Sequence, residues 1–391
     1  MGKVGVEPAG ASSGQFHSGE RGKLSAPGRL YETASGGQEN WIGILTDTQT
    51  RPEAAPPVSS PTANLFRKAV LIVALVTPFL GTLYAIFHLH LATPRDIVLM
   101  VAMYLLCCLG ITIGYHRLLT HRSFKTHAPI RFFWLALGSM ALQGPALFWA
   151  ATHLKHHAHT DREGDPHSPW ASETGPRPKN LLVGFLHAHM AWLFTAGVAP
   201  SDPAYLRRLK EDKVAVWASY TFPVWLTLGL LIPYWIGGWQ CFIWAGLVRI
   251  FLVHHVTWSV NSVCHVMGRR PFDTVDQSRN NLLVSWLAMG EGSHNTHHAY
   301  PASAQQGLEW WELDLSYFII WLMEKTGLAW DVKRIPAKSL ANRNRSRSAK
   351  QAAPAGHLVA DEPTSAPEAI AAAKEAARRL VNPPKKVSEE G

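Results

Sequence analysis

Charged residues are scarce in this chain. Asp, Glu, Lys and Arg together make up 17% of its 391 residues, whereas hydrophobic residues make up 47%. The formal net charge is +9, but the Lys and Arg residues lie in short loops between apolar stretches and in the two tails. This distribution is typical of the positively charged cytoplasmic loops of a membrane protein, and it does not indicate nucleic-acid binding.

Cysteine is rare as well, and familiar redox motifs are missing. The four cysteines, Cys107, Cys108, Cys241 and Cys264, lie in apolar stretches without CxxC spacing, so we expect small buried hydrophobic side chains rather than disulfides or metal ligands. Neither end of the chain contains a haem-binding or iron–sulfur motif, and residues 1–64 lack the charged and apolar regions of a secretory signal. Any redox chemistry is therefore expected to need a separate electron-transfer protein.

Histidine, in contrast, is abundant. The chain has 20 histidines, and nine of them form the three boxes HRLLTH, HLKHH and HNTHH together with one single residue. These nine are His116, His121, His153, His156, His157, His265, His294, His297 and His298. Each box lies just outside a long apolar stretch. Because neutral imidazole binds iron, zinc and copper well, this pattern predicts a metal site at a membrane surface.

The spacing within each box limits which side chains can meet. Residues at i, i+3 and i+4 of a helix share a face, so HLKHH and HNTHH each predict a set of ligands on one side of a helix. Five steps of an α-helix rotate by roughly 140°, so His116 and His121 either flank a helix end or bind two metals. Asn261 and His265 form another i, i+4 pair, which makes His265 a ligand candidate. His159 is expected to be a polar residue of the cap instead.

The number of histidines predicts more than one metal ion. Zinc normally takes four ligands, so eight or more histidines exceed what one zinc ion can use. Two metals are therefore expected, and redox chemistry favours iron. Two other classes stay open at this point: a membrane zinc hydrolase, which would need only three histidines and a water, and a metal transporter, which would place its ligands near the bilayer midplane.

Four apolar stretches are long enough to cross a membrane. A helix needs about 20 residues to cross a hydrocarbon core of roughly 30 Å, and the stretches that qualify are 69–91, 97–115, 214–236 and 242–260. Residues 132–151 and 181–198 are apolar too, but Gly-Pro or histidine residues interrupt them, so we expect helices at the membrane interface. The predicted fold is an all-α integral membrane protein.

The distribution of Lys and Arg predicts the orientation. Basic residues precede the first and third spans and follow the second and fourth, while the other two loops are nearly uncharged. By the positive-inside rule, both termini and all three histidine boxes are expected on the cytoplasmic side. His116 and Asn261 each lie about 19 residues along their spans, or roughly 29 Å of helix. The second and fourth predicted spans should therefore place His116 and Asn261 at the same depth relative to the membrane.

The two tails differ in composition from the apolar region. Residues 1–64 are rich in Gly, Ser, Pro and Ala, which predicts a disordered N-terminal tail. Residues 337–391 predict a mostly disordered basic tail, with a short alanine-rich helix over 367–380. The membrane domain is expected to occupy residues 65–336.

Four segments resemble the membrane fatty-acid desaturases, in particular the stearoyl-CoA and bacterial Δ9 acyl desaturase group. They are GYHRLLTHRSF (114–124), WAATHLKHHAHTDREGDPHSP (149–169), TWSVNSVCH (257–265) and GEGSHNTHHAYP (290–301). The likeness runs from about Leu65 to Pro336. It implies four transmembrane helices and a cytosolic helical cap that holds a di-iron centre. The nine histidines would be the ligands, with Asn261 acting through a water.

The same resemblance implies the reaction. Two hydrogens leave adjacent methylenes of a saturated acyl chain in the presence of O2, and a cis double bond remains, at Δ9 for this group. An external ferredoxin or cytochrome would supply the electrons. An unactivated methylene offers no site of attack to ordinary side chains, which explains the need for a metal and O2. Gln143, Trp149, Thr257 and Trp258 match residues that line the substrate tunnel beside the metals.

Several alternatives stay open at the level of the sequence. A di-iron hydroxylase of alkyl, sterol or carotenoid substrates on the same histidine scaffold is the nearest rival. The residues do not determine whether the acyl carrier is CoA or a membrane lipid, and Δ9 rests on the resemblance alone. Arg249 lies within a predicted span, where a charge is costly, and its partner is not visible. The roles of His254 and His255 are equally undetermined.

Overall fold

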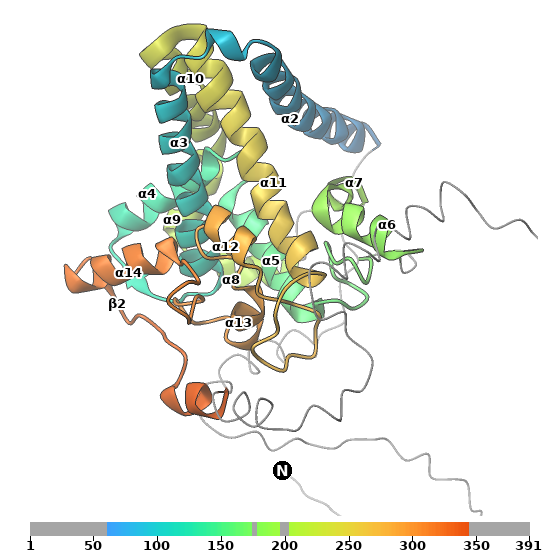
Figure 1. The fold of residues 1–391 in the computed structure, drawn as a ribbon, viewed down its shortest axis with the longest axis vertical. Helices are drawn as coiled ribbons and strands as arrows, with labels where there is room; N and C mark the ends of the chain where they lie inside the picture. The colour runs from blue at the N-terminus through green and yellow to red at the C-terminus, as the bar shows by residue number, and fades with distance from the viewer. Residues whose placement is uncertain (1–60, 174–177, 196–202, 344–391) are drawn as a thin grey trace, which may run out of the picture. The chain divides into compact units, whose positions relative to one another are not determined.

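The computed structural model describes residues 61–173, 178–195 and 203–343, which are mostly helical (Figure 1). The expected N-terminal tail up to residue 60, the C-terminal tail beyond residue 343 and the alanine-rich helix over 367–380 lie outside the described residues. Residues 61–64 begin the first helix, and residues 337–343 are helical. Helical structure therefore extends beyond both ends of the membrane domain, which was predicted to occupy residues 65–336.

Helices follow one another along the described chain, and most connections are short, whereas residues 266–281 and 300–314 form longer loops. The α-helices are α2 (Pro61–Phe87), α3 (Pro94–Leu109), α4 (Ala128–Ser139), α5 (Ala146–His159), α6 (Leu181–Leu186), α7 (Trp192–Thr195), α8 (Pro203–Leu209), α9 (Lys213–Tyr220), α10 (Phe222–Cys241), α11 (Arg249–Ser262), α12 (Leu282–Leu287), α13 (His294–Ala299) and α14 (Leu315–Lys325). The π-helices are η2 (Gly110–Thr120), η3 (His187–Ala191) and η4 (Phe242–Val248), and the 3-10 helices are η1 (Leu89–Leu91) and η5 (Val263–His265). The strands β1 (Lys125–Thr126) and β2 (Ala329–Trp330) pair antiparallel.

Three helical stretches of the described chain are long and apolar enough to cross a membrane: Leu65–Phe87, Pro94–Thr120 and Phe222–His265. The first two correspond to the first and second predicted spans. The third contains 44 residues, more than twice the ~20 that one crossing needs. It covers the third and fourth predicted spans together.

This long third stretch reverses direction at Gly237 and Gly238. Gly238 has φ 66° and ψ −150°, a combination that is essentially restricted to glycine. Beyond the break, Arg249 Nη2 donates to the carbonyl oxygen of Gly229 at 2.8 Å, although 20 residues of straight helix would separate them by about 30 Å. The arms α10 and η4–α11 therefore run side by side in opposite directions (Figure 1).

The third predicted span, 214–236, began too early. Its first residues form the separate short helix α9, whose first turn is capped by the Asp212 side chain. Helical geometry is interrupted at Thr221, and Pro223 lies in the first turn of α10, where it lacks the N–H that a continuing helix would need. The long apolar stretch therefore begins at Phe222.

The second span begins earlier than the predicted Ile97 because of its cap. Thr93 and Asp96 form a capping box, in which the threonine hydroxyl accepts from the Asp96 N–H and the aspartate accepts from the Thr93 N–H. Pro94 follows in the first turn, where its missing N–H costs nothing. These features fix the start of α3 at Pro94.

The helix α4 crosses the far end of this span at very close range. A Cβ atom on Gly110 would lie 2.2 Å from the backbone nitrogen of Gly138, and one on Gly114 would lie 2.7 Å from the carbonyl oxygen of Trp134. Only glycine permits such an approach. The crossing fixes the position of η2, which carries His116.

Arg249 is fully buried between the helices and is surrounded by backbone carbonyls. Its guanidinium donates to the carbonyl oxygens of Ala245, Met140 and Gly229 and contacts Cys107 Sγ. These carbonyl dipoles are the partner that the sequence could not identify. A charge inside an apolar bundle requires such neighbours, so Arg249 ties α10 and α11 to the end of α4.

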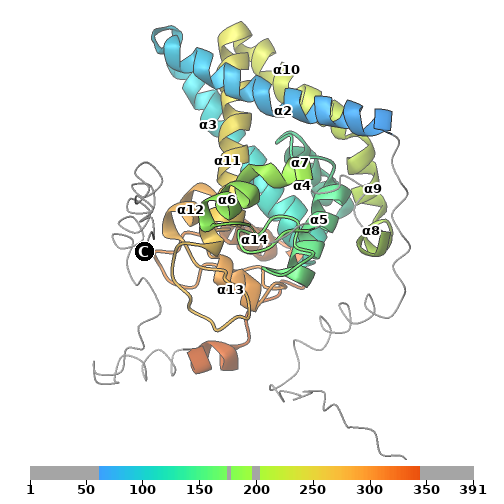
Figure 2. The ribbon, with the colours of Figure 1, turned by 90° about the vertical axis from the view of Figure 1, so that its right-hand side faces the viewer.

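The elements that carry the histidine boxes gather at one end of the long helices. In Figure 1, α5 and α13, which carry the HLKHH and HNTHH boxes, lie at the lower ends of α3 and α11, far from the end at which α10 meets α11. Figure 2 shows the same arrangement after a quarter turn. Side chains that are far apart in the sequence meet there.

We predict that Gly238→Ala destabilises the protein, because alanine is strained at this φ and ψ by about 1–3 kcal/mol. Thermal unfolding of the detergent-solubilised protein should occur at a lower temperature. Gly246→Ala is the matched control, since its Cβ would meet Leu230 at 3.4 Å, an ordinary contact, and should leave the transition in place. Equal unfolding temperatures for Gly238→Ala and the parent would contradict the reversal at this residue.

Candidate metal centre

The nine histidines of the sequence pattern come together in two groups. Within each group the ligand nitrogens lie within 4.8 Å of one another. The first group consists of His116, His121, His153, His157 and His297, and the second consists of His156, His265, His294 and His298. The groups are neighbours, because the rings of His157 and His298 stack with centroids 4.6 Å apart.

The helices α5 and α13 each supply both groups. On α5, His153 and His157 lie at i and i+4 and belong to the first group, whereas His156 belongs to the second. α13 does the converse, with one histidine in the first group and two in the second. Consecutive residues of an α-helix point about 100° apart. The HxxHH spacing therefore divides its ligands between two sites instead of presenting all three to one.

His116 and His121 belong to one group, although an α-helix would direct them apart. His116 lies on η2, a π-helix, and His121 is the residue that caps its C-terminal end; the His121 N–H donates to the carbonyl oxygen of His116 at 3.0 Å. Bonding from i to i+5 places residues five apart on one side. The helix also ends at Thr120, which agrees with the expectation that a helix end separates the pair.

The atoms that face one another inside the groups are Nε2 atoms. In the first group, His297 Nε2 lies 2.8 Å from His157 Nε2 and 3.2 Å from His116 Nε2. In the second, His265 Nε2 lies 3.0 Å from His294 Nε2. A ring whose Nδ1 keeps its proton for a carboxylate has only a lone pair at Nε2. Lone pairs that converge in this way fit a bound cation, and an all-imidazole donor set fits iron among the first-row metals.

Carboxylates hold the outer nitrogens of three histidines in the second group. The pairs are His156 Nδ1 with Asp165 Oδ1 at 3.0 Å, His265 Nδ1 with Asp161 Oδ2 at 3.0 Å and His298 Nδ1 with Asp276 Oδ2 at 3.3 Å. Such a partner fixes the tautomer and the orientation of the ring. The inward Nε2 atoms of these rings are thereby prepared as ligands.

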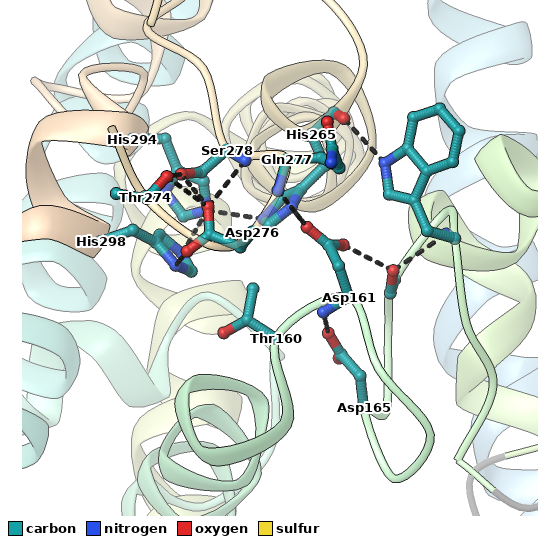
Figure 3. A network of polar contacts seen from close by, with 12 residues as sticks. Thr160, Asp161, Asp165, His265, Thr274, Asp276, Gln277, Ser278, His294 and His298 are labelled. Carbon is teal, nitrogen blue, oxygen red and sulfur yellow. Dashed lines mark hydrogen bonds and ion pairs between the residues drawn. The ribbon is translucent and has the colours of Figure 1, made fainter. Parts of the chain in front are cut away.

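The loops hold these carboxylates in turn, as Figure 3 shows. Ser278 donates to Asp276 through both its N–H and its hydroxyl, and the N–H of Gln277 donates to Asp161 at 2.7 Å. Burial alone would raise the pKa of Asp276, but its contacts with His298 and Ser278 outweigh this and hold that pKa well below its ordinary value. Asp276 therefore stays ionised beneath the histidine.

A different arrangement supports the first group. Glu291 Oε2 lies 2.6 Å from His116 Nδ1, and the same carboxylate pairs with the fully buried Arg117 at 3.2 Å. The side-chain amide of Gln306 lies 3.3 Å from His297 Nδ1. In this group, His116 therefore has a carboxylate partner that is itself paired with a guanidinium, and His297 has a neutral amide partner.

Three histidines of the first group are held neutral. Burial, and then the nearby imidazoles, lower the pKa of His153, His157 and His297 far below the ordinary histidine value. Neutral imidazole is the form that binds a metal. These side chains are therefore ready to act as ligands at neutral pH without first losing a proton.

An apolar pocket of about 490 Å³ opens beside both groups. Three histidines line it, together with residues of α3, η2, α5, α11 and the segment before α13. The lining residues are Cys108, Ile111, Thr112, His116, Trp149, His153, Val256, Thr257, Val260, Asn261, Ala288, Glu291 and His294. Asn261, the expected water holder, thus shares a wall with histidines of both groups.

The four residues expected to line a substrate tunnel take different places. Trp149 and Thr257 line the pocket, whereas Gln143 and Trp258 are not among its lining residues. Gln143 connects the first two, because its amide donates to Thr257 Oγ1 at 2.9 Å and accepts from Trp149 Nε1 at 3.1 Å. Trp258 packs against the ring of His254.

Histidines outside the pattern have other partners. His254 Nε2 lies 2.9 Å from the carbonyl oxygen of Leu142, and His255 Nδ1 lies 2.9 Å from His189 Nε2. His159 Nδ1 lies 3.1 Å from a backbone carbonyl oxygen of the following loop. They stand outside both histidine groups in the described part of the chain.

The sequence reasoning missed the outer partners of the ligands. Asp161, Asp165 and Glu291 lie within the quoted segments HTDREGDPHSP and GEGS, and the general need of a ligating histidine for a carboxylate at its second nitrogen was the signal that could have found them. Asp276 and Gln306 lie in loops without a motif. Only the folded structure brings those two to the histidines.

Comparison with known proteins agrees with this site. Residues 95–331 match the family model for fatty acid desaturases. An acetylenase of hex-5-enoyl acyl-carrier protein from Moorena producens is 40% identical over 276 residues, which cover 68% of this chain and 86% of that protein. An sn-1 stearoyl-lipid 9-desaturase from Anabaena variabilis is 37% identical over 256 residues, 65% of this chain and 89% of that protein.

A plant relative has a different printed specificity. The acyl-CoA C20 Delta5-desaturase of Anemone leveillei is 39% identical over 236 residues, which cover 59% of this chain and 72% of that protein. The relatives are thus named for different acyl carriers and different positions. The matched region of this chain includes all nine histidines of the two groups. The chain belongs to the fatty acid desaturase family and is an oxidoreductase of lipid metabolism.

Proposed function

We propose that the protein is an O2-dependent desaturase that introduces a cis double bond, at Δ9, into a saturated acyl chain carried by CoA or by a membrane lipid. Its role would be the biosynthesis of unsaturated fatty acids. The observation that carries the proposal is that both histidine groups border one apolar pocket. An apolar pocket suits an alkyl chain, and the histidine groups suit iron.

The two groups would each hold one iron ion, and Asn261, which lines the pocket beside histidines of both groups, would act through a water. Iron, when bound, supplies the oxidising power that an unactivated methylene requires. In the overall reaction –CH2–CH2– becomes –CH=CH–. One O2, the two substrate hydrogens, two protons and two electrons yield two molecules of water. The electrons come from a separate ferredoxin or cytochrome.

The side chains of the pocket would position the methylenes. Ile111, Val256, Val260 and Ala288 line it with apolar groups, which exclude water and hold an alkyl chain by contact alone. Trp149 is fixed through Gln143 rather than free to rotate. Since a misplacement of about 1 Å can cost about a hundredfold in rate, this rigid wall would select the carbon pair that faces the histidines.

We also propose four membrane crossings, by residues 65–87, by 94–120 and by the two arms of 222–265. The reversal at Gly237 and Gly238 supports two crossings in the third stretch, one by the arm before the reversal and one by the arm after it. Both termini and the histidine groups would lie on the cytoplasmic side, because basic residues flank that end of the helices. The elements around the histidines would form the cytosolic cap.

Expression in a host that lacks its own desaturase tests the function. Saturated fatty acids of defined length are supplied, and mass spectrometry locates the double bond in the CoA and lipid fractions. A Δ9 monoene is the expected product. An alcohol, or no product from protein that contains iron, would overturn the proposal, and a double bond at another position would overturn Δ9 alone.

We predict that His153→Ala lowers the iron content of the purified protein below the two ions per chain of the parent and abolishes desaturation. His153 is buried among four other imidazoles of its group. His159→Ala, on the same helix, is the matched control and should keep both iron and activity. Iron analysis and product analysis of the two variants provide the check, and unchanged activity in His153→Ala would contradict the assignment.

A second prediction concerns the pocket wall. Trp149→Ala should move the double bond or reduce turnover, because removal of the indole widens the pocket beside His116 and His153. The control is Trp217→Ala on α9, where the indole is 66% exposed, and its products should match those of the parent. Gas chromatography of the products distinguishes the outcomes. A profile of Trp149→Ala identical to the parent would count against the positioning role.

A further inference from the structure

The second histidine group has more uncompensated negative charge around it than the first. Asp161, Asp165 and Asp276, which contact three of its four histidines, are largely or fully buried. Their other bonds come from neutral groups, such as the Ser168 and Ser278 hydroxyls. In the contacts described here, each of these carboxylates therefore pairs with a ligand histidine and with neutral groups.

Charge is compensated beside the first group. Glu291, the carboxylate on His116, also accepts from Arg117 Nε at 3.2 Å. Arg117 is fully buried and pairs in addition with Asp314 at 2.8 Å. The positive charge of this guanidinium lies next to the first group and partly neutralises the negative charge of Glu291. The partner of His297, the amide of Gln306, carries no charge at all.

This difference changes how strongly the rings donate. A carboxylate that accepts the Nδ1 proton makes Nε2 a more basic ligand. Buried charges also act at full strength, since water does not screen them as it does at the surface. The second group therefore offers stronger donors and a more negative surrounding to a divalent cation than the first.

We propose that the two iron sites are unequal, and that the second group, His156, His265, His294 and His298, binds its ion more tightly and is filled first. The proposal rests on the proposed function in one respect, namely that both groups bind iron. It goes further by assigning an order of loading to the outer carboxylates Asp161, Asp165 and Asp276. The first group is then the site that exchanges its metal more readily.

Stepwise removal of iron from the full-length protein tests this order. Fe(II)-loaded protein in detergent is titrated anaerobically with a competing chelator, and iron content and the Mössbauer spectrum of 57Fe are recorded. Two release steps are expected, each with its own spectral component. A cryo-electron microscopy map of parent protein loaded with one equivalent of iron should show the ion within the second group, and this measurement needs no variant.

Conservative variants test whether the carboxylates cause the order in which the two sites are loaded. Asp276→Asn and Asp165→Asn keep the shape of the side chain and remove its charge, so the tighter step should weaken by about tenfold to a hundredfold while the weaker step stays in place. Glu291→Gln is the matched control and should weaken only the step that belongs to the first group. Size-exclusion profiles and helical content confirm that each variant is folded.

The outcomes separate this proposal from the proposed function. Release of both irons at one chelator concentration, a single equivalent found in the first group, or loss of the weaker step in Asp276→Asn would each overturn the order of loading while two-iron desaturation stands. Purified protein that binds no iron and still desaturates would overturn the proposed function itself.

Discussion

The convergence of imidazole rings depends on partners that hold individual rings from the far side. In this protein a carboxylate oxygen lies within 3.3 Å of Nδ1 in four of the nine histidines. The carboxylates are those of Asp161, Asp165, Asp276 and Glu291. Each bond keeps the proton at the outer nitrogen and leaves the inner lone pair free. The loops around the site are shaped by the need to place these carboxylates, because hydroxyl and backbone N–H groups must satisfy them in turn.

The long helices serve this site by bringing its parts to one level. The close crossing of α4 at Gly110 and Gly138 fixes the end of the second span, and the π-helical turns there bring His116 and His121 to one side. Arg249 joins both arms of the third stretch to the end of α4 through carbonyl oxygens. Backbone contacts of this kind leave little freedom for the histidines that the helices carry.

The outer bonds also distinguish the two groups from each other. Arg117 takes part of the charge of Glu291, whereas serine hydroxyls and backbone N–H groups surround the aspartates of the second group. Two sites with the same ligands can therefore differ in metal affinity because of residues that never contact the metal. The histidine boxes alone do not reveal this difference. The apolar pocket beside both groups adds surroundings of low polarity, in which interactions between charges are stronger than in water.

The sequence alone determined the composition of the site, because local spacing reveals it. The nine histidines, the apolar stretches and the likeness to desaturases are all properties of short segments, and Arg249 was recognisable as unusual because it lies within a predicted span. The family comparison confirms the desaturase assignment, while the roles of the ligands and of the pocket residues stay predictions. The expected start of the third span was wrong, since composition does not reveal the interruption at Thr221 and Pro223.

Tertiary structure decided everything that depends on distant contacts. His116 meets His297 across 181 residues of sequence, and Asp276 reaches His298 from a loop without any motif. The HxxHH spacing separates the ligands of each box, but which other histidines complete each group depends on where the helices lie. Local sequence fixes the direction of a side chain relative to its own helix. Which residue the side chain then contacts depends on how distant segments pack together. Only the folded chain establishes that packing.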